Sequence, residues 1–392
     1  MCKRTICIIS LSPVSRDARV LRQVKFLSPH YSIIVIGYGS PHPSWSDNKN
    51  IRWISVNNHE RHKISSFALL LMGKLFPQAY EWWYWRKKPH KQALEYARSI
   101  QLDAIYANDW DSLPIAVKGA HSQNAIIVFD AHEYTIGQYQ YGLLTRLFKL
   151  PAIKYLLEKN TQNVHASITV EETIAERYRR EFALDPIVVL NAPEYNPAPE
   201  RTLDQTNIKL IHHGGALRIR RLEAMIETII LADQRYSLTF MLVGDDKEYI
   251  QFLRETAKRL TPGRVHFIDP VSPEEIVNIL HKYDIGFFIL KPVHESYLHA
   301  LPNKFFDFVM AGLAVCIGPS PAMSNLARNY GFGCVAPTFD PLDVAALLNH
   351  TESVQWESMR QRALEAAKEL NAEKEMDKVL ILFDHLLDEV GN

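Results

Sequence analysis

Apolar runs of strand length alternate with helix-length amphipathic segments along this 392-residue chain. In the first half the runs cover residues 5–11, 32–37 and 51–56, and the pattern resumes at residue 208. Strands that are apolar on both faces and separated by helices indicate βαβ units, whose parallel strands are covered on both sides. We therefore predict an α/β chain built on parallel sheets, with enough residues for two domains that each bury a core.

A polar, proline-rich segment at residues 193–207 separates the two halves and has the composition of a linker. It divides the chain into a predicted N-terminal Rossmann-like domain over residues 1–192 and a C-terminal one over residues 208–370. Residues 371–392 end the chain with a helical pattern. We expect two domains of similar size joined by one linker.

Composition excludes several classes of protein. The four cysteines, Cys2, Cys7, Cys316 and Cys334, are scattered, which predicts buried thiols of a reducing compartment rather than disulfides or metal ligands. The N-terminus leads directly into a predicted strand, so we expect no signal peptide. No run of about 18 apolar residues is available to span a membrane. The expected location is cytoplasmic.

Charge is unevenly distributed, although the formal net charge is zero. Residues 1–195 hold 24 Lys and Arg against 17 Asp and Glu, whereas residues 196–392 hold 20 against 27. The positive half predicts an anionic substrate or surface as its partner. Nucleic acid is disfavoured as that partner, because no zinc-finger spacing or RNP-type aromatic motif accompanies the charge.

Two apolar segments with interspersed basic residues predict a peripheral membrane site. Residues 63–91 contain an aromatic cluster at 82–85 followed by a run of basic residues, and residues 143–154 repeat the mixture. Aromatic residues beside a basic cluster are typical of contact with an anionic leaflet. The alternative is that both segments are ordinary helices that pack on the core.

One stretch of the second half reads as a loop, a short helix and a buried strand. Pro302 suits the start of the helix and Gly312 its end. Asn303, Lys304 and Asp307 lie three or four residues apart and share one helix face. A helix N-terminus with a lysine suits a phosphate, and a carboxylate one turn further on can accept hydrogen bonds from a sugar diol. The pattern predicts a site for a nucleotide-sugar diphosphate; the alternative is an amphipathic helix whose polar face meets solvent.

A second candidate for phosphate binding follows the predicted strand that starts at residue 208. Gly214 and Gly215 let the backbone approach a ligand, and Arg218 or Arg220 supplies positive charge. As a glycine-rich loop the match is weak, because it lacks the Gly-x-Gly-x-x-Gly and P-loop patterns. Both arginines remain candidates for holding a diphosphate.

Polar residues also follow two predicted strands of the first half, Asp109 after one strand and His132 with Glu133 after the next. The carboxyl ends of parallel strands meet at one edge, where open α/β sheets bind ligands. We predict no metal site here. A lone Asp-x-Asp at Asp109 and Asp111 is weak evidence, and His132-Glu133 lacks the second histidine of a zinc motif. The alternative for His132 is a purely structural histidine.

The sequence Pro302-Asn-Lys-Phe-Phe-Asp-Phe-Val-Met-Ala-Gly-Leu-Ala-Val resembles the donor-site signature of glycosyltransferase family 4, as do Asp130-Ala-His-Glu and Asp109-Trp-Asp-Ser-Leu-Pro. The resemblance covers almost the whole chain and is to bacterial members that build surface polysaccharide. It implies a retaining, metal-independent GT-B enzyme, in which two Rossmann-like parallel-sheet domains face each other across a cleft. The N-terminal domain binds a glycan or lipid-linked acceptor, the C-terminal domain binds the nucleotide sugar as co-substrate without a further cofactor, and the last helix crosses back.

The resemblance also assigns roles to single residues. His132 contacts the donor sugar near the reacting centre, with Asp109 as the second catalytic residue. Arg16, Asp17 and Glu133 lie on the acceptor side. Arg220 is the better match to the basic residue of the family's glycine loop, and Asp307 holds the ribose. The complete donor-binding set implied by the resemblance is Gly214, Gly215, Arg218, Arg220, His299, Asn303, Lys304 and Asp307.

One position departs from the family pattern. Many members carry a carboxylate eight residues before the ribose-binding acidic residue, and here that position is His299. Either Glu295 supplies the carboxylate after a shift of the loop, or this subgroup does without it. The departure keeps two other functions open: a non-catalytic partner subunit that retains the fold, and a GT-B epimerase or hydrolase that acts on the nucleotide sugar alone.

Overall fold

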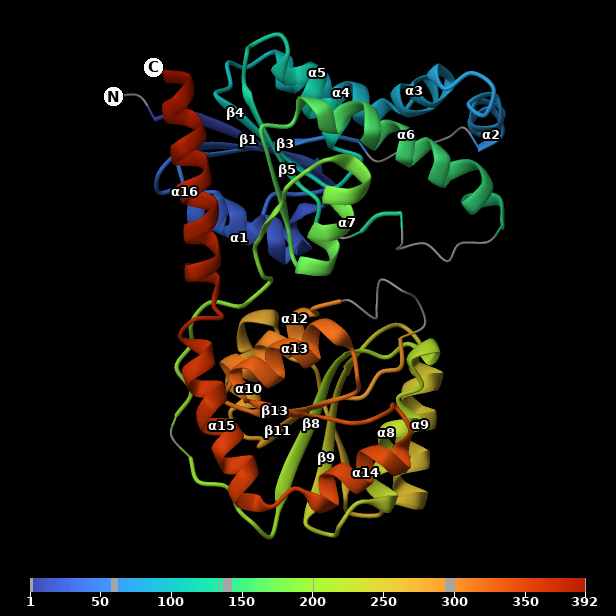
Figure 1. Cartoon of the computed structure of the whole chain (residues 1–392), viewed down its shortest axis with the longest axis vertical. Helices are drawn as coiled ribbons and strands as arrows, with labels where there is room; N and C mark the ends of the chain where they lie inside the picture. Colours follow the sequence, from blue (N-terminus) through green and yellow to red (C-terminus); the bar gives the residue numbers. More distant parts are fainter. Residues whose placement is uncertain are drawn as a thin grey trace. The chain divides into compact units, whose positions relative to one another are not determined.

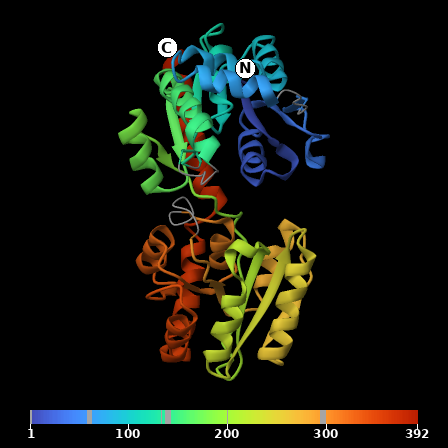
Figure 2. The ribbon, with the colours of Figure 1, turned by 90° about the vertical axis from the view of Figure 1, so that its right-hand side faces the viewer.

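The computed structural model describes residues 3–57, 63–132, 134–136, 143–199, 201–292 and 300–391. The chain forms two compact units, one comprising Met1–Val189 with Met376–Asn392 and the other Leu190–Glu375. Each unit is a parallel sheet with helices on both faces (Figures 1 and 2). The predicted α/β architecture with two parallel sheets is therefore confirmed. In the described part of the chain, no helix is long and apolar enough to cross a membrane.

The first unit contains a seven-stranded sheet with the order β3-β2-β1-β4-β5-β6-β7, so the strand order reverses between β1 and β4. Side chains alternate between its faces. Ile6 and Ile8 pack on one side with α1 and α16, and Cys7 and Ile9 pack on the other with α4 to α6. The strands are β1 (Thr5–Pro13), β2 (Ser32–Tyr38), β3 (Ile51–Ser55), β4 (Ala104–Asn108), β5 (Ile126–Asp130), β6 (Ala166–Thr169) and β7 (Ile187–Val188).

Helices of the first unit begin where the sequence supplies caps. Asp17 caps α1, since its side chain accepts a hydrogen bond from the Val20 amide. Ser112 occupies the N-cap position of α5, but its hydroxyl donates to the Asn108 and Asp109 carbonyls and accepts no hydrogen bond from a helix amide. The main helices are α1 (Ala18–Leu27), α2 (Lys63–Met72), α3 (Gln78–Trp85), α4 (Lys88–Arg98), α5 (Leu113–Ala120), the π-helix η3 (Thr145–Lys149), α6 (Leu150–Asn160), α7 (Glu172–Phe182) and α16 (Ala372–Gly391).

The second unit contains a six-stranded sheet with the order β10-β9-β8-β11-β12-β13, which reverses between β8 and β11. Its strands are β8 (Ile208–Gly215), β9 (Tyr236–Val243), β10 (Val265–Ile268), β11 (Ile285–Phe288), β12 (Ala314–Ile317) and β13 (Gly333–Val335). Its helices are α8 (Glu223–Leu231), α9 (Lys247–Leu260), α10 (Ile276–Leu280), α12 (Asn303–Met310), α13 (Pro321–Tyr330), α14 (Pro341–His350) and α15 (Ser353–Ala367). Gly312, with φ +68°, follows α12 at the predicted stop.

The segment predicted as a linker is bound to the second unit. The Asn196 side chain donates to Asn278, the Arg201 guanidinium donates to Asp284 at 2.7 Å, and the Leu203 amide donates to Glu357. At the other end of the chain, α16 belongs to the first unit from Met376 onward, where Val379 and Phe383 are fully buried.

Candidate functional site

Several of the predicted donor-site residues of the second unit lie where its strand order reverses. Lys304, in the first turn of α12, donates from Nζ to the carbonyl oxygen of His213 in β8 at 2.5 Å. The same Nζ lies 5.3 Å from the ring centroid of Phe288, the last residue of β11. The lysine therefore lies across the carboxyl ends of β8 and β11, where α/β sheets commonly bind ligands.

Gly214 is required by this arrangement. Its φ of +115° is a conformation that side-chain-bearing residues rarely adopt, and a Cβ on it would lie 2.5 Å from Lys304 Nζ. Gly215 has more space, because its nearest neighbours would be 3.9 Å from a Cβ. Glycine at residue 214 therefore lets the ammonium group lie directly against the backbone of β8.

The two candidate arginines, Arg218 and Arg220, have different surroundings in the structure. Arg218 donates from Nε to Asp246 at 2.7 Å and from Nη2 at 3.1 Å, in an exposed pair at the start of α9. Arg220 Nη1 lies 3.9 Å from where a Cβ on Gly215 would be. Arg220 thus lies beside the glycines and Lys304, whereas Arg218 is held by a carboxylate.

Burial and charge set the protonation of this group. Burial, with the charge of Arg220 as second cause, lowers the pKa of Lys304 to about 7 against the opposing effect of Asp307. Burial and then Lys304 lower the pKa of His213 to about 3, so this imidazole is neutral at physiological pH. Its Nε2 lies 3.5 Å from Asp307 Oδ2. Lys304 and Arg220 are therefore closely spaced cations that an anionic ligand would stabilise.

The structure says less about the other residues predicted to bind the donor. Asn303 is the first residue of α12 and its side chain is exposed. His299 and Glu295 lie outside the described residues, so the two alternatives for the missing carboxylate stay open.

Exchange of Gly214 for alanine should displace Lys304. We expect the affinity for nucleoside diphosphates to fall about tenfold or more, because the new Cβ would lie 2.5 Å from Lys304 Nζ and force the ammonium group to move. The free energy of unfolding should fall by about 1–3 kcal/mol, because alanine is strained at positive φ. Gly263→Ala is the matched control, since it also has positive φ, +76°, but nothing within 4 Å of a new Cβ. Calorimetric titration and denaturation of both variants check this; equal nucleotide affinity in the two would contradict it.

In the first unit, Asp109 and His132 form an ion pair at the carboxyl ends of β4 and β5. Asp109 Oδ1 lies 2.9 Å from His132 Nδ1, and their side chains are 38% and 27% exposed. Burial opposes protonation of this histidine, but Asp109 outweighs it and raises the pKa of His132 to about 9. Asp109 has φ +64°, a conformation rare outside glycine. The two predicted catalytic residues are thus brought together, with the histidine protonated at neutral pH.

A buried polar network behind this pair was not predicted. The Arg19 guanidinium donates to both oxygens of Asp130, at 2.6 and 2.5 Å, and Asp130 is fully buried. Gln23 donates to Asp130 at 2.9 Å and exchanges hydrogen bonds with Asn108. The network joins to the pair because the Asp109 amide donates to the Asp130 carbonyl. Arg19 and Gln23 therefore fix the strand ends that carry Asp109 and His132.

The acceptor-side predictions have different outcomes. Asp17 is engaged in capping α1 and accepts a further hydrogen bond from Ser12 at 2.7 Å. Glu133 lies outside the described residues, and of Arg16 only the backbone is described, in a short 3₁₀ turn. Asp111, the second acidic residue of the Asp-x-Asp pattern, is half-buried, and burial followed by the charge of Asp109 raises its pKa to about 7.

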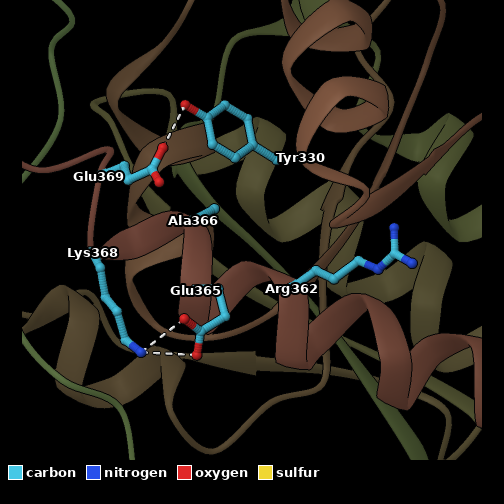
Figure 3. A pocket seen from close by; sticks show the side chains of 6 residues that line it. All are labelled: Tyr330, Arg362, Glu365, Ala366, Lys368 and Glu369. Atoms are coloured by element: carbon cyan, nitrogen blue, oxygen red, sulfur yellow. Dashed lines mark hydrogen bonds and ion pairs between the residues drawn. The ribbon is translucent and has the colours of Figure 1, made fainter.

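A separate surface recess lies between the end of α13 and α15 (Figure 3). Its polar groups largely satisfy one another: Lys368 pairs with Glu365 at 2.8 Å, and Tyr330 donates to Glu369. It contains none of the predicted site residues. Among the described residues, no group of three or more His, Cys, Asp and Glu side chains is placed to hold a metal ion.

Comparison with known proteins gives a match of fold. No protein-family model matches the chain, and no curated protein matches its sequence. HepE from Anabaena in complex with UDP matches with a TM-score of 0.72 at 11% identity, over 97% of this chain and 100% of that one. Sucrose-phosphate synthase from Thermosynechococcus elongatus matches at 0.70 and 12% identity, over 99% and 100%. The α,α-trehalose 6-phosphate synthase of Burkholderia multivorans matches at 0.65 and 12%, over both chains completely. The predicted GT-B fold is thereby confirmed, and membership of glycosyltransferase family 4 stays a prediction.

Proposed function

We propose that this chain is a glycosyltransferase that binds the diphosphate of a nucleotide sugar at Lys304. The observation that carries the proposal is a half-buried lysine at a helix start, which lies against Gly214, where the absence of a Cβ leaves room for the ammonium group. Similar structures support the choice of donor. HepE has been crystallised with UDP-glucose, and Escherichia coli trehalose-6-phosphate synthase with UDP-2-fluoro glucose. For this chain we accordingly favour a UDP-sugar.

The chemistry of transfer suits these residues. Breaking the sugar–phosphate bond builds negative charge on the departing diphosphate. Lys304, Arg220 and the amide groups at the start of α12 can stabilise that charge electrostatically. Asp307, one turn further along α12, carries a carboxylate that can accept hydrogen bonds from the ribose. We propose that the positive charge for this step comes from these protein groups, without a divalent ion.

We propose that His132 and Asp109 act at the reacting sugar. An imidazole held protonated by Asp109 is a hydrogen-bond donor suited to a sugar hydroxyl or a phosphate oxygen. From the resemblance we further propose retention of anomeric configuration and a glycan or lipid-linked acceptor of bacterial surface polysaccharide. His132→Ala should then leave the affinity for UDP within about twofold and reduce transfer by about 10² or more. Equal loss of binding and transfer would argue against this role.

A panel of UDP-, GDP- and ADP-sugars tests the function itself. We expect one nucleotide to stabilise the chain against thermal unfolding, by about 2.7 kcal/mol at one hundred times its Kd, with sugar release only when an acceptor is added. Stabilisation by no nucleotide would favour a non-catalytic partner subunit. Isomerisation or hydrolysis without acceptor would favour an epimerase or hydrolase.

Nucleotide affinity should depend on pH through Lys304. In the free chain this ammonium loses its proton as pH rises through about 7, and a bound diphosphate favours the protonated form. Affinity for UDP should therefore be highest below pH 7 and fall above it, by at most about tenfold per pH unit because one proton is taken up on binding. In Lys304→Arg the guanidinium stays charged and the fall should disappear. A wild-type affinity that is constant through this window would contradict the assignment.

A further inference from the structure

The first unit carries an exposed apolar surface that the proposed chemistry does not use. It is formed by α2, the turn after it and η3, and is here called the α2–η3 surface. Leu75 is 80% exposed and Leu143 70%. Its large apolar members, all at least 40% exposed, are Phe67, Leu71, Met72, Leu75, Phe76, Leu143, Leu144 and Leu147.

These side chains belong to one surface, although their segments are far apart in sequence. The rings of Phe67 in α2 and Phe148 in η3 meet edge to face with centroids 4.9 Å apart. Lys74 Nζ lies 4.6 Å from the centroid of the Phe148 ring. Figures 1 and 2 show α2 and α3 together on the first unit, and Figure 1 shows α6, which η3 leads into, beside them.

Basic residues outnumber acidic ones in the segments that form and adjoin this surface. Residues 63–91 and 143–159 together contain ten Lys and Arg but only two acidic residues, Glu81 and Glu158. Both acidic residues are already paired, Glu81 with Lys159 and Glu158 with Lys154 at 3.7 Å. The surroundings of the apolar side chains therefore complement an anionic partner.

We propose that the α2–η3 surface binds the interface of an anionic lipid bilayer. Exposed leucine and phenylalanine side chains enter the headgroup and acyl boundary, while long basic side chains remain at the level of the lipid phosphates. Trp82 in α3, 57% exposed, is suited to the same level. A second copy of the chain is a poorer occupant, because a two-fold interface would place this positive surface against itself.

Two buried tryptophan rings connect α3 with the His132 pair of the first unit. Lys87 Nζ lies 4.9 Å from the ring centroid of Trp83, whose ring stacks on that of Trp110 at 6.4 Å. Trp110 directly follows Asp109, which pairs with His132. Bilayer binding would thus bring a lipid-carried acceptor close to this pair. Only this last step rests on the proposed function, since binding to vesicles requires no nucleotide sugar.

Co-flotation of the full chain with vesicles tests the proposal. The vesicles are phosphatidylcholine alone, or phosphatidylcholine with about one third replaced by phosphatidylglycerol. We expect binding to the anionic vesicles that falls with added salt, and little binding to the neutral ones. The double variant Leu75→Asp/Phe76→Asp should bind the anionic vesicles at least about tenfold more weakly. Leu342→Asp, at a leucine 64% exposed in the second unit, is the matched control and should bind as wild type.

Two double variants that reverse charge test the electrostatic contribution to vesicle binding. Lys74→Glu/Lys88→Glu should weaken binding to anionic vesicles by about thirtyfold, or about fivefold for each basic residue lost. Lys258→Glu/Arg259→Glu makes the same charge change on exposed residues of α9 and should have little effect. The proposal is overturned if anionic vesicles are not bound, if neutral vesicles bind equally, or if both pairs behave alike. A dimer in solution that the Leu75 and Phe76 changes dissociate would also overturn it, in favour of a second copy.

Discussion

Exchange of Lys304 for methionine should lower the affinity for UDP by about 10²-fold without destabilising the chain. Hydrogen bonds from a charged donor to phosphate contribute about 1.5–3 kcal/mol, and more when several converge in a buried site. The lowered pKa of Lys304, about 7, indicates that its ammonium is unfavourable at this position beside Arg220. Removing it should therefore leave the free energy of unfolding unchanged or slightly raised. Residues kept for ligand binding commonly combine these two properties.

Calorimetric titration with UDP and thermal denaturation measure the two quantities separately. Arg218→Met is the matched control, because Arg218 is a nearby cation that is paired with Asp246 on an exposed surface. We expect that variant to bind UDP with nearly wild-type affinity. A Lys304→Met variant that binds UDP as tightly as wild type would remove the lysine from the site, and a large loss of stability would point to a structural role instead.

Exchange of Arg19 for methionine should have the largest effect on stability. It leaves the fully buried carboxylate of Asp130 without the guanidinium that contacts both of its oxygens. Breaking a buried pair by removing one partner costs about 3–5 kcal/mol, although the hydrogen bonds from Gln23 and Tyr106 remain. The loss should appear in unfolding followed by tryptophan fluorescence, because six of the seven tryptophans precede residue 190.

An exposed arginine of the same unit supplies the comparison. Arg179 also contacts two carboxylates, Glu172 and Asp185 at 2.6 Å each, but these are 57% and 86% exposed. Arg179→Met should therefore cost less than about 1 kcal/mol. If the two variants lose similar stability, the buried network does not hold the ends of β4 and β5 as described.

The fold follows from the sequence where strands are apolar and long enough to be seen. The runs that begin at residues 5, 32 and 208 all form buried parallel strands. Strand β13 was not predicted, because Gly333–Val335 has three residues, starts with glycine and gives no periodic signal. Short edge strands of this kind are defined by pairing with a neighbour, here β12, rather than by their own pattern.

Parts of the site were also accessible from local sequence. Lys304 and the two glycines were predicted to bind phosphate from their residue types. Asp109 and His132 follow adjacent parallel strands, so their proximity follows from topology. The contact between Lys304 and Gly214 could not be predicted, because it joins a helix start to a strand end 90 residues away.

Long-range partners account for the rest. Arg218 and Arg220 are both basic residues of one short segment, and the structure distinguishes them by the position of Asp246 beside Arg218 and of Gly215 beside Arg220. Arg19 stands in a charged segment that drew attention to Arg16 and Asp17, but its partner Asp130 is 111 residues away. A buried ion pair cannot be recognised from local sequence when each of its residues looks like an ordinary polar residue among its neighbours.

A crystal structure of the full chain with UDP bound tests the central claim most directly. The account predicts diphosphate oxygens within hydrogen-bond distance of Lys304 Nζ and Arg220, beside Gly214 and the start of α12, with the ribose at Asp307. A diphosphate bound elsewhere, or bound at this place through a divalent ion with Lys304 turned away, would contradict it.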